Sequence, residues 1–459
     1  MGILAALLTA AAAADGACDV SLVQQTSHGA CVYGSTFGCA DAGTMFVQNC
    51  SGRFTCGATT AVVVCDSVHF ARAECPCAAP APTPAPAPTP APAPTPAPGP
   101  IIGGYGAWRY QYMPDLLALP PSAEVQHCHG LEAGPDGSIY LNYVNWNNGI
   151  QTNGTDEQCL VRWAADGTGG AFLEGGGAAL CAGTPHGLTL AAEGGAMFLY
   201  HANCGTKPPR YGSGKLTKTD LRGNVVWQHD GPVPGTPMTN MNYRPTWWAV
   251  PPTGDYVYLG DGYGSSNVYV FGRDGTFANR TFGGKGGAHG KFNNCHGLHW
   301  DPRSDQVVVA DRENHRIEFY DVAPDGGSFA YNRTVVPAYG IAGTQRPCNV
   351  RVLEGAGNAT LDGLAVVADL GANDQSNATD PGVARGQVAV LDQSNALLSV
   401  IKVSELLGAQ GSVHPHDAIM LANGDIVVAT WKPGHVSYWK LLGAGDDGAG
   451  AGGAKAFEL

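Results

Sequence analysis

The tripeptide His129-Gly130-Leu131 returns twice in the chain, as His186-Gly187-Leu188 and His296-Gly297-Leu298, and a fourth, altered copy reads His416-Asp417-Ala418. Each copy is followed by a short polar or glycine-containing turn and then by an apolar strand. Self-similarity at a long, repeated interval is typical of propellers and solenoids. The repeat also places a histidine, a common metal ligand, at the same point of several β units.

Six β units align on this repeat beyond residue 101. Their average spacing of about 57 residues is long for a four-stranded blade but leaves room for loop insertions, whereas a β-solenoid needs a tighter period. Closing the units into a ring leaves few exposed strand edges. We therefore predict an all-β fold, with a six-bladed β-propeller over residues 101–442. The units open at Cys128-His129, Pro185-His186, Pro245-Thr246, Cys295-His296, Pro347-Cys348 and Pro415-His416.

The composition of the 459-residue chain suits a turn-rich β protein, because it contains 65 glycines and 14 % charged residues. The formal net charge of −13 argues against nucleic acid or an anionic membrane as a partner, since both attract basic surfaces. No apolar run after the N-terminal region approaches the roughly 20 residues that cross a bilayer. We expect a monomer without a membrane span.

The N-terminal residues have the character of a secretory signal peptide. Ile3 to Ala14 form an apolar run with a small-residue ending, although the usual basic start is missing. We predict a signal peptide over residues 1–17 and a secreted protein, located outside the cell or in the lumen of the secretory pathway. Six Asn-x-Ser/Thr sequons fit this location and predict a glycoprotein. The sequons begin at Asn49, Asn153, Asn279, Asn332, Asn358 and Asn377.

Residues 18–77 are rich in cysteine, which predicts a small disulfide-rich module in an oxidising compartment. Four bridges are expected, with their connectivity open; zinc binding is the less favoured alternative because paired C-x-x-C motifs are missing. We expect a glycan or protein partner for this module. Residues 78–100 are almost wholly Ala, Pro and Thr and predict an extended linker, and residues 443–459 form a Gly/Ala-rich tail. The eight cysteines are Cys18, Cys31, Cys39, Cys50, Cys56, Cys65, Cys75 and Cys77.

The fourth unit resembles an NHL repeat in two stretches, residues 290–298 (Gly-Lys-Phe-Asn-Asn-Cys-His-Gly-Leu) and residues 307–317 (Val-Val-Val-Ala-Asp-Arg-Glu-Asn-His-Arg-Ile). Together with Asp261-Gly262-Tyr263 and His414-Pro415-His416-Asp417, they make residues 120–440 similar to peptidylamidoglycolate lyases, the lyase domains of peptidylglycine α-amidating enzymes. The resemblance is closest between Asp261 and Tyr320.

The resemblance implies a six-bladed propeller with a zinc ion on its axis, held by three histidines that match His186, His296 and His416. These histidines open units two, four and six, and alternate blades of a six-fold ring lie about 120° apart, so that three rings can meet one ion and leave a coordination position open. The resemblance also implies a structural calcium ion. Its oxygen ligands match the main-chain carbonyls of Leu131 and Leu188 and the carboxylate of Asp417, as a hard cation requires.

Tyr263 and Arg312 match catalytic residues of the lyases. In that family a peptidyl-α-hydroxyglycine is split into an amidated peptide and glyoxylate. By resemblance, Tyr263 is the general base on the carbinol hydroxyl, zinc is the Lewis acid and Arg312 stabilises developing negative charge. A tyrosine with an ordinary pKa of about 10 needs a neighbouring cation for this role, and zinc and Arg312 are the two candidates. The alternative for Arg312 is an ion pair with Asp311 or Glu313.

Two departures from the lyases leave a second interpretation open. The family has a further catalytic arginine in unit one, but this chain has no arginine between Arg109 and Arg162, so that Arg244 or Arg346 would have to substitute. His129 is a fourth histidine, and its addition to the zinc ligands would turn a catalytic site into a structural one. The alternative function is therefore a non-catalytic propeller with a structural metal that binds peptide, glycan or protein.

Further expectations concern the cysteines and tryptophans of the propeller. Cys128, Cys295 and Cys348 abut the ring of histidines and are expected to be thiols, bridges or soft zinc ligands. A disulfide is expected within the group Cys159, Cys181 and Cys204. The pair Trp247-Trp248 is expected in the core, with a binding mouth as the alternative.

Overall fold

The chain forms two compact units, Met1–Pro98 and Gly99–Leu459. The predicted signal peptide, nearly all of the linker and tail, and the sequons at Asn49, Asn153 and Asn377 lie outside the residues that this computed structural model describes. No helix among the described residues is long and apolar enough to cross a bilayer. The described residues are 19–25, 31–41, 44–48, 50–56, 62–66, 72–77, 99–147, 150–151, 158–175, 177–181, 183–205, 214–237, 243–336, 345–371, 386–407 and 413–443.

The small unit consists of two antiparallel sheets with a disulfide-bonded core, which confirms the predicted module. One sheet has the order β1 (Val20–Gln25), β4 (Ser51–Cys56), β5 (Val62–Asp66), and the other β2 (Phe37–Asp41), β3 (Thr44–Gln48), β6 (Arg72–Pro76). Disulfides join Cys31 to Cys50, Cys56 to Cys77 and Cys65 to Cys75, and Cys39 is also disulfide-bonded.

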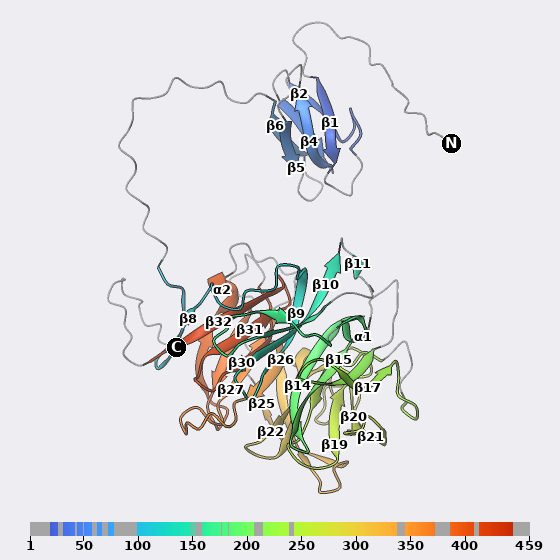
Figure 1. Cartoon of the computed structure of the whole chain (residues 1–459), viewed down its shortest axis with the longest axis vertical. Coiled ribbons are helices and arrows are strands. Elements are labelled where there is room, and N and C mark those ends of the chain that lie inside the picture. Colours follow the sequence, from blue (N-terminus) through green and yellow to red (C-terminus); the bar gives the residue numbers. More distant parts are fainter. Residues whose placement is uncertain are drawn as a thin grey trace. The chain divides into compact units, whose positions relative to one another are not determined.

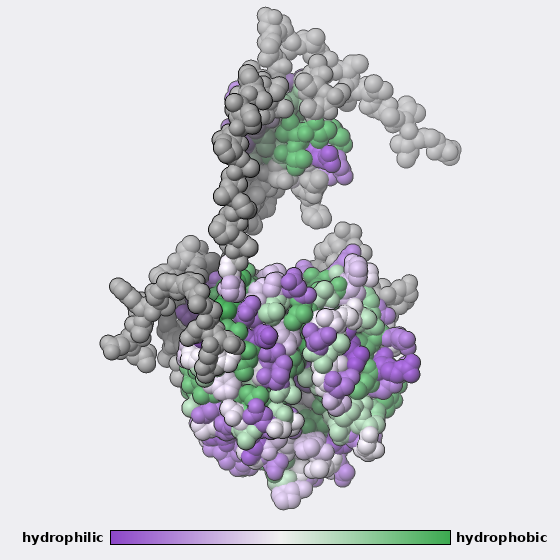
Figure 2. Space-filling model, turned by 60° about the vertical axis from the view of Figure 1, so that its left-hand side comes forward, coloured by the Kyte–Doolittle hydropathy of each residue, from purple (hydrophilic) through white to green (hydrophobic). Residues whose placement is uncertain are grey.

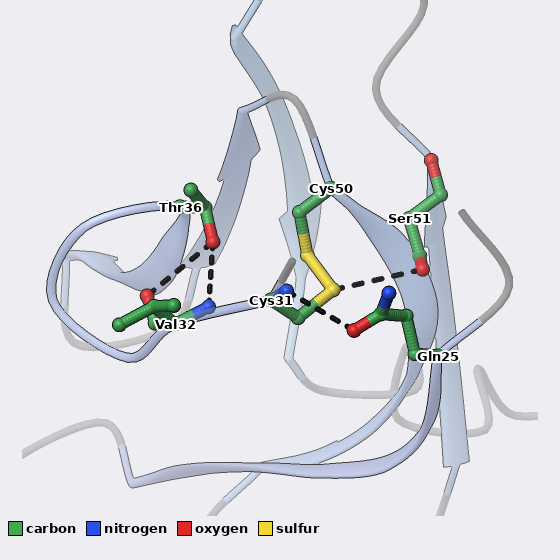
Figure 3. Close-up of a disulfide and its surroundings, with 6 residues drawn as sticks. All are labelled: Gln25, Cys31, Val32, Thr36, Cys50 and Ser51. Carbon is green, nitrogen blue, oxygen red and sulfur yellow. Dashed lines mark hydrogen bonds between the residues drawn. A yellow bond between two sulfur atoms is a disulfide. The ribbon is translucent and has the colours of Figure 1, made fainter. Parts of the chain in front are cut away.

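The disulfide between Cys31 and Cys50 lies beside a tight turn (Figure 3). The Cys31 N–H donates to Gln25 Oε1 at 3.1 Å, and the Val32 N–H donates to Thr36 Oγ1 at 2.6 Å. A unit this small buries little apolar area, so cross-links of this kind carry much of its stability. Figure 2 also shows hydrophobic surface on the small unit. Exposed apolar side chains there are Val23, Val32, Tyr33, Val62 and Val64.

The large unit is a six-bladed β-propeller, as predicted (Figure 1). Its first blade contains β9 (Val125–Ala133), β10 (Ile139–Asn147), β12 (Leu160–Trp163) and β13 (Ala171–Phe172), with β11 (Ile150–Gln151) paired to the end of β10. The second contains β14 (Pro185–Glu193), β15 (Ala196–Asn203), β16 (Lys215–Asp220) and β17 (Val225–Asp230). The third contains β18 (Trp247–Ala249), β19 (Tyr256–Gly260), β20 (Asn267–Gly272) and β21 (Phe277–Gly283).

Three further blades complete the ring. The fourth contains β22 (Cys295–Asp301), β23 (Gln306–Asp311), β24 (Arg316–Val322) and β25 (Phe329–Val335), and the fifth β26 (Pro347–Val352), β27 (Ala365–Asp369), β28 (Gln387–Leu391) and β29 (Leu397–Ile401). The sixth contains β30 (Pro415–Met420), β31 (Ile426–Thr430), β32 (His435–Leu442), β8 (Trp108–Tyr112) and β7 (Ile102–Tyr105). Short helical segments are α1 (Ala178–Cys181), η1 (Arg312–Asn314) and α2 (Val403–Leu407).

The innermost strands of the blades surround a common axis. Each of β9, β14, β18, β22, β26 and β30 neighbours the next in this order, and β30 neighbours β9. Short runs of β-branched and small apolar residues form the blades, and β23 and β31 are buried along their whole length because blades pack on both of their faces. The ring closes where β8, from the N-terminal part of the unit, pairs with β32, and Tyr112 lies opposite Trp439.

Candidate functional site

The histidines of the repeat lie at β-bulges near the start of innermost strands. The pairing of β14 with β15, β22 with β23 and β30 with β31 shifts register at His186, His296 and His416, and the pairing of β9 with β10 shifts around His129. A bulge turns a side chain away from the ordinary alternation of a strand. The same local feature, a β-bulge, therefore accompanies each histidine at this level of the channel.

The glycine after each histidine allows adjacent blades to approach. A Cβ on Gly130 would lie 2.7 Å from Leu188 N, and one on Gly187 or Gly297 would overlap the main chain of the next blade. In the altered fourth copy, Asp417 takes this position, and its Oδ2 accepts from the Leu131 N–H at 2.9 Å. In the three His-Gly-Leu copies, the motif therefore combines a metal-capable ring with a backbone contact that a larger residue would obstruct.

Four histidine rings meet in the channel, and each is at most 3 % exposed. The ring centroids of His186 and His416 lie 4.6 Å apart, and both rings contact His296, at 4.7 and 4.8 Å. His129 contacts the same two rings, at 4.9 and 4.5 Å. The nitrogens of His129, His186 and His416 all lie within 4.8 Å of one another, which makes these three residues a candidate metal site.

The hydrogen bonds of the cluster indicate which ring nitrogens carry a lone pair. His186 Nδ1 donates to Thr246 O at 2.9 Å, so its Nε2 is an acceptor, and neither ring nitrogen of the buried His416 has a hydrogen-bond partner among the described residues. Burial lowers the pKa of His416 well below its ordinary value, and the neighbouring imidazoles lower it further. Neutral imidazoles are the form that binds metals, so the residues present fit a zinc ion.

The structure thus brings together all three histidines that the resemblance assigns to zinc, and adds His129 to them. His296 differs from the others because its Nε2 accepts from the Tyr263 hydroxyl at 2.8 Å, while its Nδ1 donates to Cys348 O at 2.8 Å. Burial, and then the charge of Arg312, lowers the pKa of His296 well below its ordinary value. His186 and His416 belong to both possible ligand sets, and the third ligand is His129 or His296.

Tyr263 and Arg312 lie beside the histidines and contact one another. Arg312 Nη1 donates to the Tyr263 hydroxyl at 3.2 Å, and the guanidinium lies 5.3 Å from the Tyr263 ring centroid. Burial raises the pKa of Tyr263 to about 12, and Arg312 opposes this shift. Tyr263 is nevertheless 40 % exposed as a residue, so its ring reaches solvent while its hydroxyl lies among buried partners. Arg312, in η1, is 8 % exposed.

Arg346 is linked to the same group through Glu313. Arg312 Nε donates to Glu313 Oε1 at 2.9 Å, and Arg346 Nη2 donates to the same oxygen. The expected alternative for Arg312, an ion pair with Glu313, is therefore formed together with the contact to Tyr263. The Arg244 N–H donates to Asp261 Oδ1 at 2.6 Å. Arg346, one of the two candidate substitutes for the second arginine, therefore shares Glu313 with Arg312.

The three oxygens that the resemblance assigns to calcium also lie together, but they bind a side chain. Arg351, on β26, donates from Nη2 to Leu131 O at 2.9 Å and to Leu188 O at 2.7 Å. The same nitrogen lies 3.2 Å from Asp417 Oδ2. Calcium requires six to eight oxygen ligands at roughly 2.3–2.6 Å. The described arrangement does not fit calcium, because a guanidinium already takes the three oxygens.

The cysteines and tryptophans near the channel form a disulfide or are buried in the core. Cys159 forms a disulfide with Cys181, while Cys128, Cys295 and Cys348 are buried thiols. Burial raises the pKa of Cys348 to about 11. The remaining member of the expected disulfide group, Cys204, donates its thiol to Pro245 O at 3.2 Å. Trp247 and Trp248 are both fully buried, as expected for the core, and the Trp247 ring stacks on His416 at 6.0 Å.

No family model and no curated protein matches the chain. Solved structures with a similar fold include a catalytically inactive virginiamycin B lyase from Staphylococcus aureus with quinupristin, at 12 % identity and a TM-score of 0.39 over 71 % of this chain and 98 % of that one. A luciferin-regenerating enzyme matches at 13 % identity and a TM-score of 0.43, over 75 % and 96 %. A nidogen–laminin complex matches at 13 % identity and 0.37, over 67 % and 94 %. The assignment of the propeller rests on the sheets and on the ring of inner strands, and not on these similarities.

Proposed function

We propose that the propeller is a metal-dependent lyase that splits peptidyl-α-hydroxyglycines into an amidated peptide and glyoxylate. The observation that supports this function most is the position of the Tyr263 hydroxyl, between His296 Nε2 and Arg312 Nη1 and beside the histidine cluster. A phenol can remove a carbinol proton, a guanidinium can stabilise the negative charge that develops, and convergent imidazoles can hold a metal ion.

A zinc ion in this site would be held by His186, His416 and a third histidine. The short nitrogen separations favour His129 as the third ligand, since His296 Nε2 accepts from Tyr263. When bound, the metal supplies a Lewis acid for a substrate oxygen and a positive charge that favours the phenolate of Tyr263.

The residues of the chain would then divide the reaction between them. As a phenolate, Tyr263 takes the proton of the carbinol O–H, the C–O bond becomes a carbonyl while the C–N bond breaks, and Tyr263 then passes that proton to the leaving amide nitrogen. Arg312 stabilises the negative charge on the Tyr263 oxygen and on the substrate, because its Nη1 already lies at hydrogen-bond distance from that oxygen. Glu313 positions Arg312 and Arg346 together. Tyr263 is 40 % exposed, so a peptide would reach the site on the side of this residue.

A second candidate function is a non-catalytic propeller with a structural metal. The near-complete burial of four histidines favours it, because a further protein ligand would take the coordination position that a substrate needs. In that case the propeller would bind a peptide, glycan or protein, and the small unit would contribute a second binding surface.

Glyoxylate release from a model peptidyl-α-hydroxyglycine distinguishes the two functions. We expect the metal-loaded protein to release glyoxylate, and Tyr263→Phe to lower the rate by about 100-fold or more with unchanged metal content and melting temperature. Tyr331→Phe is the matched control, since Tyr331 is also 40 % exposed but contacts Thr334 on β25. A metal-loaded wild-type protein that releases no glyoxylate would contradict the lyase and support the second function.

A further inference from the structure

Arg351 connects four blades of the propeller from a single side chain. It lies on β26 in the fifth blade, and its guanidinium reaches Leu131 in the first blade, Leu188 in the second and Asp417 in the sixth. The Arg351 side chain is 7 % exposed, and the Asp417 side chain is fully buried. A buried guanidinium with these contacts holds the inner strands together across the channel.

The charges around Arg351 are matched by buried acids. Arg351 Nη1 donates to Glu132 Oε1 at 2.6 Å, and Nε lies 3.5 Å from Asp417 Oδ1. The Asp417 carboxylate also accepts from Asn349 Nδ2 and from the Leu131 N–H, both at 2.9 Å. The group therefore has its own cation, its own anions and a nearly complete set of hydrogen bonds, which is the condition under which buried charges stabilise a fold.

We infer that Arg351 is a built-in cation that replaces a structural metal ion on the propeller axis. Two main-chain carbonyls and one carboxylate are the ligands that a hard divalent cation would take. All three oxygens lie 2.7–3.2 Å from one nitrogen of Arg351, so a metal ion among them would face a positive charge at that distance. The axis is thus held by a side chain, and its stability does not depend on calcium.

The same side chain positions the candidate metal site. Leu131 and Leu188 come two residues after His129 and His186, and Asp417 directly follows His416. Arg351 therefore holds the three strands that carry the histidines whose nitrogens lie closest together. Its guanidinium also lies 5.4 Å from the ring centroid of Trp247, and that ring stacks on His416. Arg351 is a positioning residue, because it acts on the histidines through their own strands.

Thermal unfolding with and without calcium tests this inference separately from any lyase activity. We expect the melting temperature of the wild-type protein to stay within about 1 °C when 1 mM CaCl2 replaces EGTA. Arg351→Ala should melt at a lower temperature and regain at least about 4 °C with 1 mM CaCl2, because the three oxygens then lack their cation. Arg351→Lys keeps a positive charge and should show no calcium response.

Arg303→Ala is the matched control. The Arg303 side chain is 13 % exposed and donates to Asp301, Asn395 and the main chain of Gly363, so its loss should also lower the melting temperature, but without a calcium response. Titration with Co²⁺ gives a second measurement: Arg351→Ala should bind Co²⁺ at least about tenfold more weakly than wild type, and calcium should restore the affinity.

Two results would overturn the inference. One is stoichiometric calcium binding by the wild-type protein with a rise in its melting temperature. The other is an Arg351→Ala protein that behaves as Arg303→Ala does, with unchanged Co²⁺ affinity and no gain from calcium. If Arg351→Ala does not fold in EGTA, folding that is restored by calcium supports the inference, and folding that calcium does not restore contradicts it.

Discussion

Two levels of the same channel differ in how their buried polar groups are compensated. At one level four imidazoles converge, and burial keeps His296 and His416 neutral. At the next level, one or two residues further along the same strands, carbonyls and carboxylates converge on Arg351. The chain supplies the cation among the oxygens of the second level, whereas the buried histidines of the first level are neutral metal ligands. A cation from solution is therefore expected at the histidines and not at Arg351.

The largest expected effect is the loss of zinc affinity when a histidine ligand is removed from the first level. We expect His416→Ala to weaken zinc binding by about 1,000-fold or more, because His416 belongs to both possible ligand sets. Zinc content after gel filtration and competition with a chromophoric chelator measure the change. His289→Ala, at a histidine whose side chain is 55 % exposed and pairs with Glu318, is the control. Equal zinc content in the two variants would break the contrast between the levels.

The third ligand can be assigned by comparing two variants. If His129 completes the site, His129→Ala should release zinc, while His296→Ala should keep it and lose activity through the altered contact of Tyr263. The reverse pattern would assign zinc to His186, His296 and His416, as the resemblance implies.

A substitution between the two levels should damage both of them. A Cβ on Gly187 would overlap Thr246 O of the third blade, and Gly187 separates His186 from Leu188. We expect Gly187→Ala to lower the free energy of unfolding by about 3 kcal/mol and to weaken zinc binding as well. Gly177→Ala, where a Cβ meets nothing within 4 Å, is the control in denaturant titrations. A large loss of stability with unchanged zinc affinity would show that the levels are independent.

The smallest expected effect is on the pH dependence of the free energy of unfolding, and it tests whether burial alone keeps a histidine neutral. His201 is buried, and burial lowers its pKa to about 3, although its Nε2 has a partner in Thr219 Oγ1. The unfolded chain takes up a proton near pH 6.5 and the folded chain does not, so this stability is present above pH 6.5 and is lost as the pH falls towards 3. The free energy of unfolding of wild type, relative to His201→Asn, should fall by about 1 kcal/mol per pH unit below pH 6.5. Parallel curves for the two metal-free proteins would contradict the claim.

The sequence was sufficient to predict the blades and the meeting of the histidines, because both follow from one local repeat. A period in the sequence becomes a rotation about the axis, so residues at equivalent positions share one level of the channel. The pairing of β8 with β32 was not predicted, since Trp108–Tyr112 carries no copy of the motif and its partner lies at the other end of the propeller.

The place of Arg351 was not predicted either, although the sequence contains a signal for it. Units one and five open at Cys128-His129 and Pro347-Cys348. Glu132 comes three residues after His129, and Arg351 comes three residues after Cys348. Opposite charges at the same position of two inner strands predict a pair across the axis. The pattern does not predict that the guanidinium also contacts Leu188 and Asp417, because these contacts depend on how the strands pack.

The closure of the ring by β8 and β32 also has a consequence during biosynthesis. The sixth blade needs strands from both ends of the propeller, so β8 is made early and pairs only with β7, among the described strands of its sheet, until β32 leaves the ribosome. His416 lies on β30 of this last blade. The histidine site is therefore completed only when the ring is, and a truncated product that lacks the sixth blade would also lack His416, which both proposed ligand sets require.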